Sequence, residues 1–194
     1  MTEKGIRTRN HFIEVSAALF NHYGYAGTSV DTILDKAGYS KGALYRTFKD
    51  KEEIVVEAFK FNLKELGTRM QKEIDKELTA KRKLNAMFRL YTDVILGKIF
   101  PNGCPLLNTS VEVDDTNDQM RLIASKAFDT WRDLIREILE EGIKNNEFDQ
   151  NMDIGQVPDF IIATIEGSIA ISKAQKNPSI VVNNIQMLKQ ILNF

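Results

Sequence analysis

The sequence predicts an all-α protein, with a three-helix head of helix-turn-helix type, a larger helical body and about nine helices in total. Apolar residues recur at helical spacing in most stretches between turn signals. The 194 residues include only 4 Pro and 11 Gly, too few for a turn-rich β fold. We divide the chain into the head, residues 1–50, and the body, residues 51–194.

The first helix is predicted over residues 11–23, where apolar side chains form one stripe. Thr8 is its predicted N-cap, and Gly24 ends it. The helix is long enough to serve as a packing platform for the shorter helices that follow.

Two very short helices are predicted next. Thr28 or Ser29 caps the first, which ends at Gly38, and Ser40 caps the second, over residues 41–48. Two short helices joined by a turn that contains Gly form a helix-turn-helix, whose second helix enters the DNA major groove. The pair predicts a DNA-binding domain.

The predicted helix starts in the head are candidate phosphate sites, because free backbone N–H groups and the helix dipole favour an anion there. Thr28, Ser29, Ser40 and Lys51 lie at or near such starts. Residues 1–51 contain eight Lys or Arg and five Asp or Glu, a charge of +3, while the rest of the chain carries −4. A basic head on an acidic body favours an anionic partner at the head, although scatter alone can give this difference.

The motif residues of the head stand at fixed spacings. They are Gly24-Tyr25-Ala26-Gly27-Thr28-Ser29-Val30, Ile33, Ala37-Gly38-Tyr39-Ser40-Lys41-Gly42-Ala43-Leu44-Tyr45, Phe48, Lys51 and Glu52. Over residues 8–53 this pattern resembles the DNA-binding head of the TetR (tetracycline-repressor) family. It departs from the family at Leu34, where Ala is customary, and at Tyr39, where a small aliphatic residue is usual.

The resemblance implies a set of DNA contacts. Tyr45, Lys51 and Thr28 are expected on phosphates, with Lys4, Arg7 and Arg9 as an arm along the backbone or in the minor groove. Lys41, Gly42 and Arg46 are expected to face the major groove, where Arg46 reads a guanine edge or binds a phosphate. A solvated basic surface is the alternative for each of them.

Body helices are predicted over residues 51–76, 84–99, 105–113, 118–145, 156–176 and 178–193. Small residues in the fifth of these (Gly167, Ala170 and Ala174) would let helices pack closely. Val181, Ile185 and Leu188 of the last helix repeat at coiled-coil-like spacing. We expect these six residues at a homodimer interface, a four-helix bundle on a two-fold axis, with burial inside one subunit as the alternative.

Cys104, Asn108 and Glu112 are spaced four apart. This segment resembles a subgroup of TetR-type repressors in which the matching Cys senses electrophiles. Cys104 is then a sensor with a low thiol pKa or an inert packed residue, and the nearest basic residue in the sequence is Lys98. Asn108 and Glu112 either orient a ligand or join helices within the subunit.

A ligand site for an apolar small molecule is expected inside the body. Its candidate residues are Met87, Phe88, Tyr91, Phe100, Cys104, Leu107, Asn108, Glu112, Phe128, Trp131 and Ile161, each of which can instead be plain core. Glu166, an acid in an apolar helix, is expected at the dimer seam or at a ligand.

The sequence and the resemblance together predict a homodimeric transcriptional repressor. It would bind a palindromic double-stranded DNA operator and be released by a small apolar or electrophilic effector; control by a partner protein, without a small ligand, is the alternative. An enzyme is not expected, because the only His residues, His11 and His22, lie in the head, away from Cys104.

No metal, cofactor, disulfide or membrane partner is expected. The chain has a single Cys, no apolar run of roughly 18 residues, and a polar segment over residues 1–10. These features favour a cytoplasmic protein.

Overall fold

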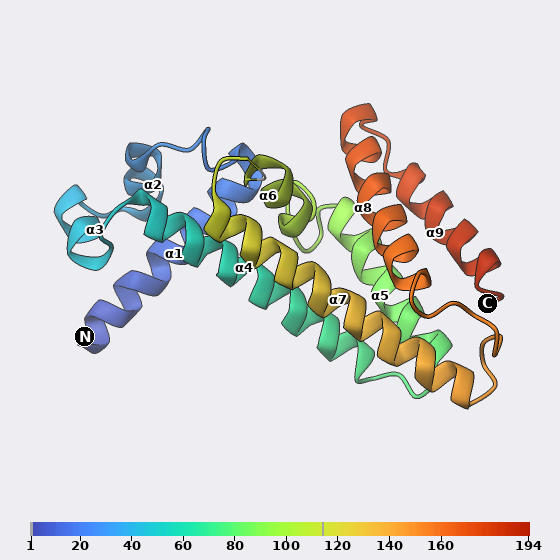
Figure 1. The fold of residues 1–194 in the computed structure, drawn as a ribbon. Helices are drawn as coiled ribbons and strands as arrows, with labels where there is room; N and C mark the ends of the chain where they lie inside the picture. The colour runs from blue at the N-terminus through green and yellow to red at the C-terminus, as the bar shows by residue number, and fades with distance from the viewer. Residues whose placement is uncertain (1, 114) are drawn as a thin grey trace. The chain divides into compact units, whose positions relative to one another are not determined.

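The computed structural model describes residues 2–113 and 115–194, and within them the regular structure consists of nine helices. These are α1 (Glu3–Tyr23), α2 (Val30–Ala37), α3 (Lys41–Thr47), α4 (Lys51–Ile74), α5 (Ala80–Ile95), α6 (Pro105–Val113), α7 (Asp118–Lys144), α8 (Val157–Gln175) and α9 (Ser179–Ile191) (Figure 1). The predicted all-α class is confirmed. None of the helices in the described residues is both long and apolar enough to cross a membrane.

The helices form two compact units, which do not follow chain order. The N-terminal unit comprises residues 1–66 and 105–123, so that α6 and the first turn of α7 join α1–α3 and most of α4. The second unit comprises residues 67–104 and 124–194. A single cut at residue 50 therefore does not describe the grouping of the helices, because α6 packs with the helices of the head.

Helix α1 begins eight residues earlier than the sequence pattern suggested. Thr2 caps it by accepting a hydrogen bond from the Gly5 amide at 3.2 Å. Thr8 is not the N-cap, because its hydroxyl lies inside the helix and donates to the Lys4 carbonyl at 3.0 Å. Gly24 ends α1 with a φ of 73°, a left-handed value that Gly adopts without strain.

The short helices α2 and α3 have the caps expected of them. Ser29, rather than Thr28, accepts from the Thr32 amide, and Ser40 accepts from the Ala43 amide. Gly38, with a φ of 71°, makes the turn between the two helices. Their apolar faces meet α1 and α4 in one core that includes Phe12, Ile13, Leu19, Ile33, Ala37, Leu44, Phe48 and Ile54.

In the second unit, α5, α8 and α9 pack together, with α8 and α9 forming a hairpin (Figure 1). Thr79 caps α5 by accepting from the Arg82 amide. Gly142 of α7 is covered by the Phe148 ring, which lies only 2.2 Å from where a Cβ would stand. Any larger residue at this position would push the ring out of the unit's core.

Candidate functional site

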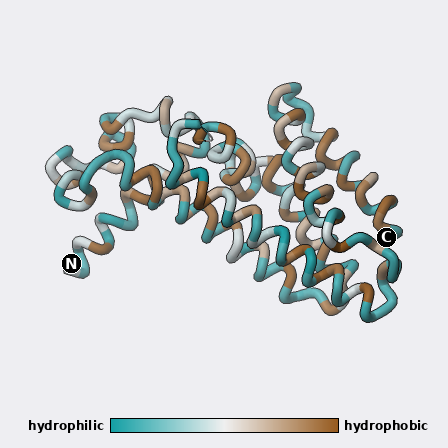
Figure 2. Tube along the Cα trace, viewed as in Figure 1, coloured by the Kyte–Doolittle hydropathy of each residue, from teal (hydrophilic) through white to brown (hydrophobic). Residues whose placement is uncertain are grey.

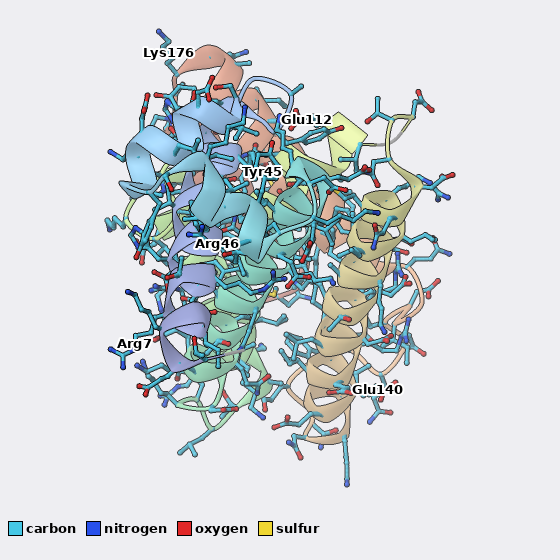
Figure 3. The ribbon with its side chains drawn as sticks, turned by 90° about the vertical axis from the view of Figure 1, so that its left-hand side faces the viewer. Arg7, Tyr45, Arg46, Glu112, Glu140 and Lys176 are labelled. Carbon is cyan, nitrogen blue, oxygen red and sulfur yellow. The ribbon has the colours of Figure 1, made fainter. Side chains whose placement is uncertain are left out.

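The exposed face of α3 carries the residues predicted to meet DNA. Lys41, Gly42, Tyr45 and Arg46 are all exposed, as are the two capping serines of the motif. Figure 3 shows Tyr45 and Arg46 on this helix, on the side turned toward the viewer. Leu44 is fully buried between them and the core, so the helix is anchored through its inner face while its outer face stays available.

Arg9 supports α3 instead of extending an arm. Its guanidinium donates to the Thr47 carbonyl at 3.0 Å and to Glu53 Oε1 at 2.9 Å, and it lies 4.4 Å from the centre of the Phe48 ring. The Lys49 amide and Arg9 both donate to Glu53, and these bonds lower the pKa of that carboxyl. Arg9 thus joins α1 to the end of α3 and the start of α4.

Lys4 and Arg7, predicted to form an arm along the DNA, both lie in α1. Arg7 is highly exposed (Figure 3), and it pairs with Glu3, which lies one turn before it. An exposed arginine on a helix can still reach a phosphate, so a DNA contact by Arg7 stays a prediction. It would be made from a fixed helix.

Thr28 and Lys51 both bond to the loop of residues 24–28, which connects α1 to α2. Thr28 is only 1% exposed, and its hydroxyl donates to the Gly24 carbonyl at 2.7 Å. The hydroxyl proton of Thr28 is thus used within the turn, and the predicted contact of its hydroxyl and amide with the DNA backbone stays a prediction. Lys51 is half-buried and donates to the Tyr25 carbonyl at 2.6 Å, which leaves two of its three ammonium protons for another acceptor.

Glu112 of α6 binds the same loop. Its carboxylate accepts hydrogen bonds from the amides of Tyr25, at 3.1 Å, and Ala26, at 2.9 Å. Asn108, one turn earlier on α6, donates to Asn21 Oδ1 at 2.8 Å. The structure thus supports the second of the two roles considered for Asn108 and Glu112, joining helices within the subunit.

Cys104 lies in the other unit, directly before the first residue of α6. Its side chain is completely buried, and the thiol donates to Glu166 Oε1 at 3.0 Å. Glu166 is 6% exposed, and its Oε2 has no hydrogen-bond partner among the described residues. Burial raises the pKa of Glu166 to about 7, and the bond from Cys104 opposes this only in part.

Aromatic side chains accompany this pair. Tyr91 stacks on Trp131 with ring centres 4.7 Å apart, and the Trp131 indole N–H donates to Met87 Sδ at 3.3 Å. Burial raises the pKa of Tyr91, and the charges of Cys104 and Glu166 raise it further. We call Met87, Tyr91, Cys104, Trp131 and Glu166 the body cluster.

The other predicted ligand residues take different positions. Phe88 stacks on Phe194, Ile161 and Phe100 are buried, and Phe128 is half-buried. Leu107 belongs with α6 to the N-terminal unit. Four of the eleven predicted residues therefore contribute to the body cluster.

Lys173 is a neighbour of Cys104 that sequence reasoning missed. Its Cδ and Nζ lie 3.1 and 3.5 Å from where a Cβ on Gly103 would stand. Burial lowers the pKa of Lys173, and the charge of Cys104 opposes this. Glu166 and Lys173 are seven residues apart on α8, two helical turns, and this spacing is the only local signal that could have linked them.

The coiled-coil-like spacing in α9 marks its buried face. Val181 is 0% exposed and Leu188 is 1% exposed within a single chain, and Ile185 is also buried. These three residues cannot bury further area against a second subunit, so their predicted place at a dimer interface is wrong. Their partners are α8 and α5 of the same chain.

The outer faces of α8 and α9 are apolar and exposed. Gly167, Ala170 and Ala174 lie there, and Figure 2 shows hydrophobic residues recurring along both helices. The large side chains exposed on these helices are Phe160, Ile171, Val182, Met187 and Ile191, each about half exposed. Such a surface is typical of a protein–protein interface.

Comparison with known proteins identifies the chain. Residues 12–58 match the family model described as bacterial regulatory proteins, tetR family, and residues 80–188 match the model of the tetracyclin repressor-like C-terminal domain. The chain belongs to the TetR family. It is therefore a DNA-binding transcriptional regulator with a helix-turn-helix head, and not an enzyme.

Individual TetR-family proteins resemble it along most of its length. The crystal structure of a TetR transcriptional regulator from Chloroflexus aurantiacus has a TM-score of 0.93 and 29% identity, covering 99% of this chain and 97% of the other. The repressor DhaR of a Mycobacterium species is 25% identical over 87% of this chain and 84% of its own. FadR of Bacillus subtilis, solved with stearoyl-CoA, has a TM-score of 0.75 at 22% identity, covering 94% and 97%.

Proposed function

We propose that this TetR-family regulator is a homodimeric repressor, released from a palindromic operator when an effector reaches the body cluster. The observation that carries the proposal is the geometry of α3. Its inner face is locked into the core by Leu44 and its last turn is held by Arg9, so Tyr45 and Arg46 are presented on a rigid helix. A rigid helix in the major groove reads few bases, and two of them one helical turn of DNA apart read a palindrome.

The outer faces of α8 and α9 are the proposed dimer surface. Small residues at Gly167, Ala170 and Ala174 permit close approach of a second helix pair, and Ile171 and Met187 supply apolar area beside them. We therefore propose the four-helix bundle of the dimer on the exposed face of the hairpin.

The body cluster supports a small apolar effector with a hydrogen-bonding group. It contains aromatic and sulfur-containing side chains, and Glu166 Oε2 lacks a hydrogen bond that a ligand can supply. FadR, at 22% identity, was solved with stearoyl-CoA, a molecule with a long apolar chain. That relative supports an apolar effector class without naming the effector of this chain.

An electrophilic effector would use Cys104 as its nucleophile. When Cys104 adds to a quinone, the sulfur forms a bond to a ring carbon and an electron pair moves to the carbonyl oxygen. The thiol proton passes through Glu166 to that oxygen. No leaving group or external oxidant is needed. Because Cys104 is completely buried, the quinone must first enter the cluster.

The test uses an operator duplex selected with the wild-type protein and followed by fluorescence anisotropy. We expect salt-sensitive binding by a dimer and release by p-benzoquinone. Release that persists in Cys104→Ser excludes the covalent route. Absence of salt-sensitive binding to any selected palindrome contradicts the proposed repressor.

A further inference from the structure

The turn after α1 presents two consecutive backbone amides to one carboxylate. Gly24 has a left-handed φ of 73°, and the amides of Tyr25 and Ala26 follow it. Tyr25 N donates to Glu112 Oε2 and Ala26 N donates to Glu112 Oε1, so each carboxylate oxygen binds one amide. Hydrogen bonds to a charged acceptor are about twice as strong as neutral ones, and consecutive amides of this kind form an anion site.

A second set of bonds holds α6 at the same place. The Tyr25 hydroxyl donates to the Glu112 carbonyl at 3.1 Å and lies 2.7 Å from the Thr116 hydroxyl. Asn108 Nδ2 donates to Asn21 Oδ1 at the end of α1. The side chain and the backbone of Glu112 therefore both bind Tyr25, which fixes the direction of the loop as well as its distance from α6.

Lys51, the proposed phosphate contact, binds the same loop. Lys51 donates to the carbonyl of Tyr25, whose amide and hydroxyl bind Glu112. Thr28 donates to the Gly24 carbonyl, which stiffens the same turn. Tyr25 thus connects Glu112 to Lys51, because its amide donates to the Glu112 carboxylate and its carbonyl accepts from the Lys51 ammonium group.

We infer that Glu112 is a positioning residue for DNA binding, which holds the loop of residues 24–28 so that Lys51 meets the operator backbone. The inference rests on the proposed phosphate contact of Lys51. In this inference Glu112 acts through the loop, since each of its carboxylate oxygens accepts a loop amide.

The sign of a mutational effect separates positioning from simple electrostatics. Removing a negative charge near a DNA-binding surface raises affinity for DNA when the charge acts only through its field. Loss of a positioning carboxylate lowers the affinity, because the loop and Lys51 must be ordered again on binding. The two accounts therefore predict opposite changes for the same substitution.

The decisive variant is Glu112→Gln in the full-length protein, which keeps the shape of the side chain but turns one acceptor into a donor that faces an amide. We expect its affinity for the selected operator duplex to fall about tenfold. The matched control is Glu14→Ala, which removes an exposed acidic side chain from α1 of the same unit. It is expected to leave the affinity unchanged or to raise it.

The salt dependence of binding locates the effect. Lys51→Ala is expected to reduce the slope of log affinity against log salt by about two for a dimer, one for each subunit. Glu112→Gln is expected to reduce the same slope, although it removes a negative charge. In the double variant, the loss should be smaller than the product of the two single losses, because both act on one contact.

Operator binding by Glu112→Gln at or above wild-type affinity overturns the inference. An unchanged salt slope in Lys51→Ala contradicts the proposed phosphate contact, and a persisting loss in Glu112→Gln would then rule out a route through Lys51. If Glu112→Gln does not fold, as judged by thermal unfolding, Tyr25→Phe takes its place. It removes only the hydroxyl bonds, and we expect about a threefold loss of operator affinity that wild-type binding would refute.

Discussion

Two buried or half-buried carboxylates are treated in opposite ways by the two units of this protein. In the N-terminal unit, both oxygens of Glu112 accept backbone amides. In the second unit, Glu166 is more deeply buried, receives one thiol and leaves Oε2 without a partner among the described residues. The first arrangement fixes a shape, whereas the second retains an unmet hydrogen-bonding capacity in an apolar setting.

This difference matches the tasks proposed for the two units. A DNA-reading surface needs side chains whose positions are set before the duplex arrives, and satisfied polar networks provide that rigidity. A site that responds to a small molecule gains from groups whose bonds are incomplete until the molecule binds. The environments of Glu112 and Glu166 therefore fit the reading role of the N-terminal unit and the sensing role proposed for the second unit.

The largest effect is expected at Arg46, because this residue tests most directly whether the N-terminal unit reads the operator sequence. Arg46→Ala removes the candidate base contact from both half-sites, and each good bidentate contact is worth about 1–3 kcal/mol. We expect operator affinity to fall at least a hundredfold in anisotropy titrations. Lys176→Ala, which removes an exposed positive charge from the end of α8, is the control (Figure 3). An equal loss in both variants would refute specific reading by α3.

The second-largest effect is expected in the free energy of unfolding, which should depend on pH in opposite directions through Glu166 and through Glu53. The pKa of Glu166 is raised to about 7 in the folded state, so the folded protein binds this proton more tightly than the unfolded chain. The free energy of unfolding should then decrease from about pH 4.5 to about pH 7, by about 3 kcal/mol, and level off above that. Glu166→Gln should abolish this decrease in urea unfolding curves.

Glu53 sharpens the contrast because its pKa is lowered by the Lys49 amide and by Arg9. Its contribution is present above the unfolded pKa of about 4.5 and is lost as the pH falls through the folded value. Glu53→Gln should therefore remove stability at neutral pH and leave the acid end unchanged. Parallel pH profiles for the two variants would contradict the assignment of opposite environments.

Local signals in the sequence predict α2 and α3 accurately, but they misplace the start of α1 and predict the contacts between helices poorly. Ser29, Gly38 and Ser40 mark the ends of α2 and α3 because caps act within three or four residues. The contacts of Glu112 with Tyr25 and Ala26 span more than 80 residues, and no periodicity encodes such a pairing.

The same limit applies in the second unit. The partners of Cys104 come from α8, and Glu166 lies 62 residues further along the chain. The spacing of Val181, Ile185 and Leu188 correctly marks a buried face of α9, but periodicity cannot tell whether a neighbouring helix of the same chain or of a second chain covers that face.

Two adjacent valines test that distinction. Val181 is fully buried in one chain and Val182 is about half exposed on the proposed dimer surface. Val181→Ala should lower the free energy of unfolding by about 1–2 kcal/mol through the cavity it leaves. Val182→Ser should leave the monomer fold intact and weaken dimerisation several-fold in analytical ultracentrifugation. If Val181→Ala weakens dimerisation more than Val182→Ser does, the buried face of α9 that contains Val181 belongs to the dimer interface after all.

The smallest effect is expected at the start of α1, where Thr2 caps the helix in place of the predicted Thr8. Thr2 accepts from the Gly5 amide, so Thr2→Ala should fray the first turn and cost about 0.5–1 kcal/mol of helix stability. Thr8 is inside the helix and donates to the Lys4 carbonyl, and Thr8→Ala should be neutral or slightly stabilising because Ala is the better helix former. Hydrogen exchange of the amides between the two threonines distinguishes them. Faster exchange in Thr8→Ala alone would mean that the helix begins at Thr8 and that the residues before it, including Arg7, form an arm. Faster exchange in Thr2→Ala alone would mean that Thr2 caps the helix, so that Arg7 lies on a preformed helix of the N-terminal unit.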